Sequence, residues 1–332
     1  MTAASNRNVQ IVAITVGVLL MVGKFVAWSI TGSNAILTDA LESIINVVAA
    51  SVALYSIYLA SRPRDLNHPY GHGKVEFLSS GFEGGLIVVA GVAIAAKSVY
   101  NLFYPTALAQ LDLGLAITAL TGIVNYGMGL TMVRQGRSTQ SITLEAGGKH
   151  LLTDAYSTIA LIVGLGVVIA TGYTWLDSLM AIAMGGYIIY AGWRIVRRSI
   201  AGIMDEADYE LIKEMVTELN DHRSPNWIDV HNLRVIKYGA TLHVDCHITL
   251  PWYFNVREAH DELDAFEGFF EQHSERPYEL FVHSDPCIPE SCAICTKPNC
   301  PVRQQPFMKR VEWTMTNVVK NQKHYYEGVA RR

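Results

Sequence analysis

Cysteine is absent from the first 245 of the 332 residues, and charged residues make up only 17% of the chain. The sequence also lacks a phosphate-binding motif of the G-x4-G-K-[ST] type and a nucleophile with a nearby base. We therefore expect no enzyme, no organic cofactor and no nucleic-acid partner. All five cysteines follow the last apolar run, where metal or redox chemistry in a reducing compartment explains them better than a disulfide framework.

Hydrophobic residues make up 50% of the chain, and the mean hydropathy is +0.21. Apolar runs of about 20 residues are long enough to cross a bilayer as helices. Lys24 and Lys97 interrupt two such runs, and lysine side chains can reach water from near a helix end. We predict an all-α membrane domain over residues 1–200, with six helices at 9–31, 34–61, 78–102, 108–133, 147–171 and 174–196.

The loops between these runs differ in charge. Those at 31–34, 103–109 and 171–174 contain no lysine or arginine, whereas the opposite loops are basic. The positive-inside rule then predicts a multi-pass protein of the cytoplasmic (inner) membrane, with both termini in the cytoplasm. The first run is too long for a signal peptide and lacks a cleavage site, so we expect it to be retained.

The composition becomes polar after Ser199. Residues 206–286 predict the order α-β-β-α-β, which favours a small open-faced α+β sandwich, and a cysteine-rich tail follows at 287–332. The expected elements are a helix at 208–220, strands at 227–238 and 240–250, a helix at 256–273, a strand at 279–283 and a short helix near 309–320.

Two polar pairs interrupt apolar runs with a spacing of four residues, which places each pair on one helix face. They are Glu42 with Asn46 and His150 with Asp154, and Asp39 precedes Glu42 by about one turn. A charged side chain in a bilayer costs at least ~2.5–3.5 kcal/mol, so such residues usually mark a path or a site. Two carboxylates, an amide and an imidazole can bind one divalent cation and take up protons without it. Hydrogen bonding between helices is the alternative explanation.

Two histidine-rich groups lie outside the apolar runs. Asp65, His68 and His72 follow a D-x2-H-x3-H spacing on a loop with proline and glycine, which suits one metal ion or a solvated loop equally well. The predicted sandwich carries a second candidate set, with His243 and Asp245 as substitutes on the strand face of His247. That set consists of His231, His247, His260, His283 and Asp285.

The tail contains the spacing C-x4-C-x2-C-x4-C. Four thiolates this close in sequence predict a tetrahedral zinc site, while reactive thiols or an iron–sulfur cluster are the alternatives. The residues are Cys287, Cys292, Cys295 and Cys300.

Taken together, these motifs resemble the cation diffusion facilitator family, whose members include bacterial zinc and iron efflux carriers. The resemblance is carried by TDALESIIN, NHPYGHGK, KHLLTD and VHSDP, and it covers the chain to about residue 287. It implies a six-helix transport domain, a ferredoxin-like cytosolic domain, a homodimer and proton-coupled export of divalent metal. It gives no role for the cysteine tail.

The resemblance also implies roles for individual residues. Glu42, Asn46, His150 and Asp154 correspond to the transport site, and Lys74 with Asp205 corresponds to an interlocking salt bridge. The loop residues Asp65, His68 and His72 correspond to a loop metal site. A binuclear site near the dimer interface corresponds to His231, His247, His260, His283 and Asp285.

His150 and Asp154 match the family's zinc pattern, whereas Glu42 and Asn46 stand where His or Asp and then Asp are usual. The prediction is therefore export of Zn²⁺ from the cytoplasm by proton antiport. Fe²⁺, Co²⁺, Ni²⁺, Cd²⁺ and Mn²⁺ stay open as cargo, and a metal-responsive membrane sensor without transport is the rival function.

Overall fold

The computed structural model describes residues 2–31, 34–104, 111–171, 175–239, 241–273 and 277–326. The side chains of Asp39 and Glu42 lie outside the described residues, as do residues 108–110, 174 and 240 of the predicted elements. The chain forms two compact units, Met1–Met204 and Asp205–Arg332.

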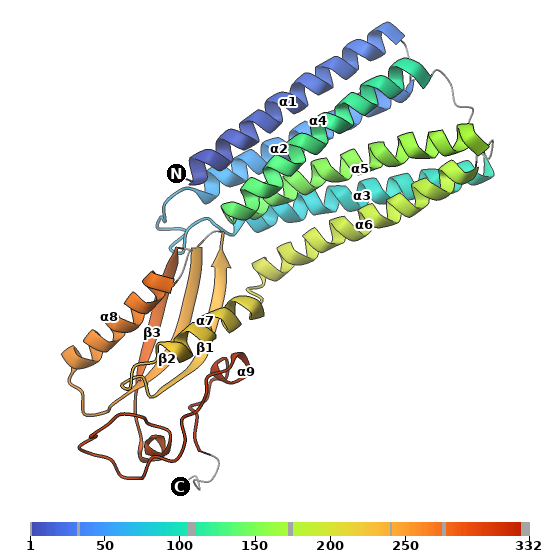
Figure 1. Ribbon diagram of the computed structural model, residues 1–332. Coiled ribbons are helices and arrows are strands. Elements are labelled where there is room, and N and C mark those ends of the chain that lie inside the picture. Colours follow the sequence, from blue (N-terminus) through green and yellow to red (C-terminus); the bar gives the residue numbers. More distant parts are fainter. Residues whose placement is uncertain are drawn as a thin grey trace. The chain divides into compact units, whose positions relative to one another are not determined.

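The first unit consists of long helices, as predicted from the apolar runs. Helix α3 packs along α6, α4 along α5, and α1 along α2 (Figure 1). Among the described residues, four of these helices hold an apolar segment long enough to cross a membrane: Ala4–Val26, Ser43–Ala60, Val75–Phe103 and Ser178–Ile203. The helices are α1 (Thr2–Thr31), α2 (Asn34–Ala60), α3 (Val75–Phe103), α4 (Leu111–Ser138), α5 (Ile142–Thr171) and α6 (Trp175–Ile203).

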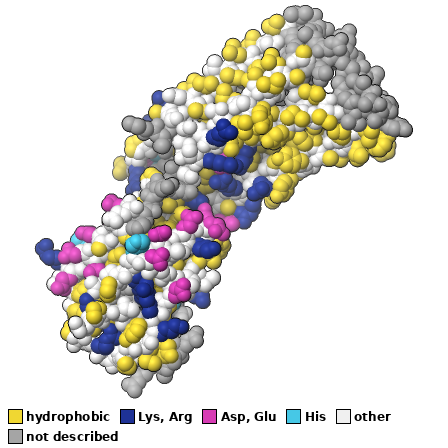
Figure 2. Space-filling view, viewed as in Figure 1, with side chains coloured by type: hydrophobic (Ala, Val, Ile, Leu, Met, Phe, Trp, Pro, Cys, Tyr) yellow, Lys and Arg dark blue, Asp and Glu magenta, His cyan; other side chains and the backbone are white. Residues whose placement is uncertain are grey.

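The outer surface of the helical unit is apolar. Figure 2 shows hydrophobic side chains spread over its visible face. Leu19 and Val89, which lie in the middle of their helices, are each 66% exposed. An apolar surface of this extent suits contact with lipid, and the unit is a transmembrane domain as expected.

Close packing and one buried carboxylate fix the position of α5. A Cβ atom at Gly148 would lie 2.7 Å from the backbone nitrogen of Val133 on α4, so only glycine permits this approach. At the start of α5, the hydroxyl of Ser141 donates a 2.7 Å hydrogen bond to Glu76 of α3. The amide of Thr143 donates to the same carboxylate oxygen at 3.2 Å. The α5 residues that follow are thereby held against both α3 and α4.

The second unit has the predicted order α-β-β-α-β. Helix α7 (Tyr209–Asp221) precedes β1 (Asp229–Tyr238) and β2 (Thr241–Leu250), and α8 (Val256–His273) connects β2 to β3 (Tyr278–Pro286). The sheet order is β1-β2-β3, with β1 and β2 antiparallel and β2 and β3 parallel. Alternate β2 residues, among them Val244 and Ile248, join the helices in one core, so the intervening polar residues lie on the opposite face.

The tail completes this unit. After the 3-10 helix η1 (Pro289–Ala293), the chain returns to the core through Trp313, which is 2% exposed. The predicted helix near 309–320 is too long, since only α9 (Met315–Val318) is helical. Residues 309–314 are not helical. In this segment the carbonyls of Val311 and Trp313 instead accept hydrogen bonds from the side chains of Arg223 and Asn220.

Candidate metal centre

Three of the four predicted transport-site residues meet inside the helical unit. Asn46 of α2 faces His150 and Asp154 of α5. The His150 Nε2 lies 3.1 Å from the Asn46 Oδ1, and the Asn46 Nδ2 donates to the Asp154 Oδ2 at 3.2 Å. The His150 Nε2 and the Asp154 Oδ2 are 3.7 Å apart. Imidazole, amide and carboxylate groups therefore converge on one point. Glu42, the fourth residue, has its side chain outside the described residues.

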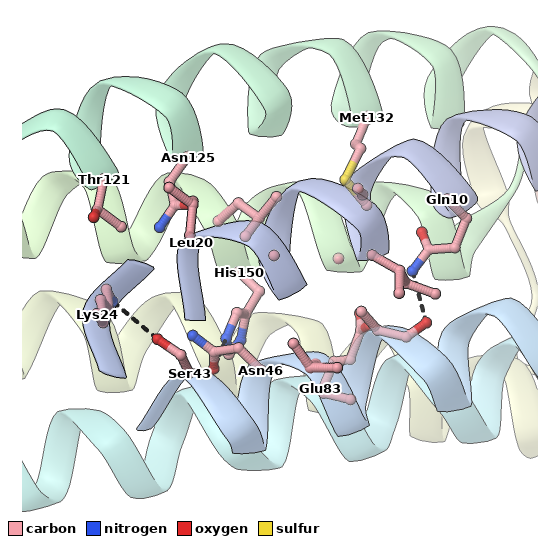
Figure 3. A pocket seen from close by; sticks show the side chains of 18 residues that line it. Gln10, Leu20, Lys24, Ser43, Asn46, Glu83, Thr121, Asn125, Met132 and His150 are labelled. Atoms are coloured by element: carbon pink, nitrogen blue, oxygen red, sulfur yellow. Dashed lines mark hydrogen bonds between the residues drawn. The ribbon is translucent and has the colours of Figure 1, made fainter. Parts of the chain in front are cut away.

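A cavity of about 70 Å³ adjoins this point and is lined by residues of α1 to α5, including Asn46 and His150 (Figure 3). Its wall carries a lysine that sequence reasoning placed near a helix end. The ammonium group of Lys24 is instead buried and donates a 2.9 Å hydrogen bond to the hydroxyl of Ser43. A cation fixed in the cavity wall favours anionic groups nearby.

Glu83 is a buried carboxylate of the same cavity that the sequence analysis missed. It is 2% exposed on α3, and its Oε2 has no hydrogen-bond partner among the described residues. A Cβ atom at Gly147 would lie 3.4 Å from the Glu83 Oε1. Gly147 is about one turn before His150 on α5, and all three residues line the same cavity. The signal was available, because an acidic residue in an apolar run is itself unusual.

The loop residues Asp65, His68 and His72 form what we call the loop group. One ligand atom from each residue lies within 4.8 Å of the others. The Asp65 carboxylate lies 3.1 Å from the His68 Nδ1 and 3.3 Å from the His72 Nε2. Backbone hydrogen bonds from His68 lower the pKa of Asp65, so the carboxylate stays ionised and available to a cation.

A second group, the sheet group, consists of His231, His247 and Asp285, one from each strand. Their ligand atoms also lie within 4.8 Å of one another. The Asp285 Oδ2 is 3.1 Å from the His247 Nδ1 and 3.4 Å from the His231 Nε2. Strand register explains the grouping, because His231 pairs with His247 across β1 and β2.

The remaining predicted ligands of this domain lie outside the sheet group. The His283 ring is 4.7 Å from the His247 ring, next to the group, whereas His260 of α8 is exposed and 3.7 Å from Asp264. His243 points to another carboxylate, Glu279, at 3.0 Å.

The tail adds groups that sequence reasoning did not find. The His324 Nδ1 lies 2.5 Å from the Asp229 carboxylate, and the Lys323 ammonium lies 3.5 Å from that of Asp285. Burial alone would raise the pKa of Asp229, but hydrogen bonds from His231 and His324 outweigh it and hold the pKa well below its usual range. These contacts join residues far apart in sequence, so no local sequence pattern predicts them.

The cysteines divide into two kinds. Cys246 lies in the core of the second unit, where burial raises the pKa of its thiol to about 12 and keeps it protonated. The four tail cysteines instead line one common pocket: Cys287, Cys292, Cys295 and Cys300. Lys74 belongs to the first unit and Asp205 to the second, and their salt bridge stays a prediction.

Known protein families and individual proteins match most of the chain. Residues 10–204 match the cation efflux transmembrane domain, and residues 204–287 match the cation efflux protein cytoplasmic domain. An uncharacterized transporter of Synechocystis, sll1263, is 32% identical over 267 residues, which cover 80% of this chain and 86% of that protein.

Two further relatives have names that refer to metals or cations. Metal tolerance protein 2 of Oryza sativa is 30% identical over 84% of this chain and 78% of its own length. The cation-efflux pump FieF of Shewanella oneidensis is 24% identical over 82% of this chain and 92% of its own length. With two family domains covering residues 10–287 in the expected order, the chain belongs to the cation efflux family, the cation diffusion facilitators.

Proposed function

We propose that this member of the family exports Zn²⁺ from the cytoplasm in exchange for protons, as a homodimer in the inner membrane. The observation that carries the proposal is the convergence of Asn46, His150 and Asp154 inside the helical unit, beside a cavity. Glu42, four residues before Asn46 on α2, is the fourth proposed ligand, and Asp39 extends the path.

The chemistry of these side chains supports exchange of metal for protons. Zn²⁺ binds neutral imidazole and ionised carboxylate in tetrahedral sites. The two carboxylates of Glu42 and Asp154 balance its charge, whereas Asn46 contributes a neutral oxygen. Because metal ligands must be deprotonated, protons compete with Zn²⁺ for the same atoms. Alternating access of the site to the two sides of the membrane then couples the two fluxes.

The other metal-ligand groups have accessory roles in this proposal. The loop group, half exposed at Asp65 and His68, collects metal on the cytoplasmic side. The sheet group senses metal, with His283 and His260 completing a second ion position near the dimer interface. The Lys74–Asp205 salt bridge fastens the helices to the cytosolic domain. In each of these roles the group acts outside the transport path.

The test is metal uptake into everted membrane vesicles under an imposed pH gradient. Asp154→Asn keeps the size of the side chain but removes its charge. We expect Zn²⁺ uptake to fall by roughly 100-fold or more, since the loss of a residue that only supports a metal ligand already costs about 10–100-fold. Ser157→Ala is the matched control on the same helix, since the Ser157 hydroxyl donates a 2.8 Å hydrogen bond to the backbone carbonyl of Asp154 and not to its carboxylate.

Undiminished Zn²⁺ uptake by the Asp154→Asn protein would refute the site. Stoichiometric metal binding by the wild-type protein without uptake would support the rival function, a metal-responsive sensor. Preference for Fe²⁺, Co²⁺, Ni²⁺, Cd²⁺ or Mn²⁺ in direct competition would keep the site and change the cargo.

A further inference from the structure

The four tail cysteines lie together although they belong to different local structures. Cys287 directly follows β3, Cys292 lies in η1, and Cys295 and Cys300 lie in the loop beyond it. All of them line one pocket of about 40 Å³ within the second unit. Cys295 is 5% exposed and the others are partly buried. The matched cytoplasmic domain of the family ends at residue 287, so three of the four cysteines lie beyond it.

The loop that carries the cysteines is held in place by a single arginine. The Arg303 guanidinium donates hydrogen bonds to the carbonyls of Cys292 at 2.9 Å, Cys295 at 3.1 Å and Lys297 at 3.0 Å. Cys295 also packs against Ile228 in a small apolar cluster. The backbone from Cys292 to Lys297 is therefore held in place, which lowers the entropy that a bound ion must overcome.

One hydrogen-bond donor points at a sulfur atom, and a second donor lines the same pocket. The Trp252 amide donates to the Cys287 Sγ at 3.5 Å. The Tyr253 hydroxyl lines the same pocket and has no hydrogen-bond partner among the described residues. Donors of this kind stabilise metal-bound thiolates and are typical of the surroundings of metal ligands.

We propose that Cys287, Cys292, Cys295 and Cys300 form a closed structural metal site that binds one Zn²⁺ through four thiolates. Four protein ligands leave no open position, which distinguishes such a site from one that passes its ion on. A Zn²⁺ ion with four thiolates carries two net negative charges, and the basic residues Lys297 and Arg303 line the same pocket. No three of the four sulfur atoms lie within 4.8 Å of one another, so the ion would draw them closer together as it binds.

The site would fasten the tail to the domain. From Cys300 the chain continues to Trp313 in the core and to Lys323 and His324, which contact Asp285 and Asp229 beside the sheet group. An ion at the cysteine pocket therefore fixes the start of a segment whose end lies against a second metal-ligand group.

The test uses the full-length protein in detergent, measured for bound zinc after removal of weakly held metal. We expect the variant with all four tail cysteines changed to serine to lose one zinc per chain. Cys246→Ser, the matched control, should lose none. In protein reconstituted with Co²⁺, near-ultraviolet thiolate-to-cobalt charge-transfer bands should vanish in the fourfold variant and persist in Asp154→Asn, which separates this site from the transport site.

A second measurement keeps the test decisive if the fourfold variant misfolds. In the folded wild-type protein, four thiols should be unreactive toward a thiol reagent until a strong zinc chelator is added, while Cys246 stays unreactive throughout. Thiols that react fully without chelator, disulfides between them, or iron with acid-labile sulfide in place of zinc would each overturn the proposal.

Discussion

At the scale of single residues, the ionisable side chains that line the cavity come from three helices, α1, α3 and α5. Asn46 on α2 is neutral, whereas Glu83 on α3 places an acidic group in the cavity that His150 of α5 also lines. Lys24 adds a buried cation to the same wall. We infer that Glu83 offers a cation on its way to the proposed site an acidic group that Asn46 does not.

Changing Glu83→Gln tests this inference. The amide has nearly the same size, so the packing stays and only the ability of the group to ionise is lost. We expect the Zn²⁺ concentration for half-maximal uptake to rise roughly tenfold, equivalent to about 1.4 kcal/mol. The control is Ser79→Ala, one turn earlier on α3, which removes another buried polar group that does not line the cavity. Equal uptake curves for Glu83→Gln and wild-type protein would contradict the role.

At the scale of elements, the helical unit depends on pairs of helices whose backbones nearly touch. A Cβ atom at Gly192 of α6 would lie 2.9 Å from the carbonyl oxygen of Gly84 on α3. Small residues permit this approach, and in lipid such packing replaces the hydrophobic effect as the force between helices. Gly84 adjoins Glu83, so the α3–α6 contact also sets the position of that carboxylate.

Replacing Gly192 by valine should therefore separate α3 from α6. We expect a lower yield of folded protein and a thermal unfolding temperature several degrees lower, in line with the ~1–3 kcal/mol cost of overpacking. Gly186→Val on the same helix is the control, because a Cβ atom at Gly186 meets nothing within 4 Å. Equal unfolding temperatures for the two variants in one detergent would show that the contact is dispensable.

At the scale of the whole molecule, the second unit is larger than the family's cytoplasmic domain because the tail belongs to its core. Trp313 packs with residues of α7, α8 and the sheet, and the Arg223 guanidinium lies 3.8 Å from the centre of its ring. The sheet that carries the sheet group therefore depends on residues more than twenty positions beyond the matched domain.

Trp313→Ala should destabilise this unit by about 3–5 kcal/mol, the usual cost of emptying such a buried site. Hydrogen–deuterium exchange of the β1 and β2 amides in the full-length protein is the measurement, and protection should fall by roughly 100-fold or more. Phe307→Ala, which removes a side chain that is 48% exposed, is the control and should change protection little. Unchanged β1 and β2 exchange in Trp313→Ala would show that the tail is not part of this core.

Sequence alone determined the features that depend on local periodicity. Apolar runs specified the long helices, since only a helix satisfies its own backbone hydrogen bonds in lipid. Alternation specified the strands, and the four-residue spacing placed His150 and Asp154 on one face of α5. The same patterns supplied the α-β-β-α-β order and the motifs that resemble the family.

Tertiary structure decided which distant residues meet. The Glu83 carboxylate reaches the cavity only because α3 packs against α5, and Lys24 is buried only because α2 places Ser43 beside it. The sheet group excludes His260 because strand register, and not spacing along the chain, sets those distances. The tail was expected to be a separate segment, yet Trp313 lies in the core. Such contacts join residues that are far apart in the chain. They form because of packing energy between distant segments, which local sequence patterns do not predict.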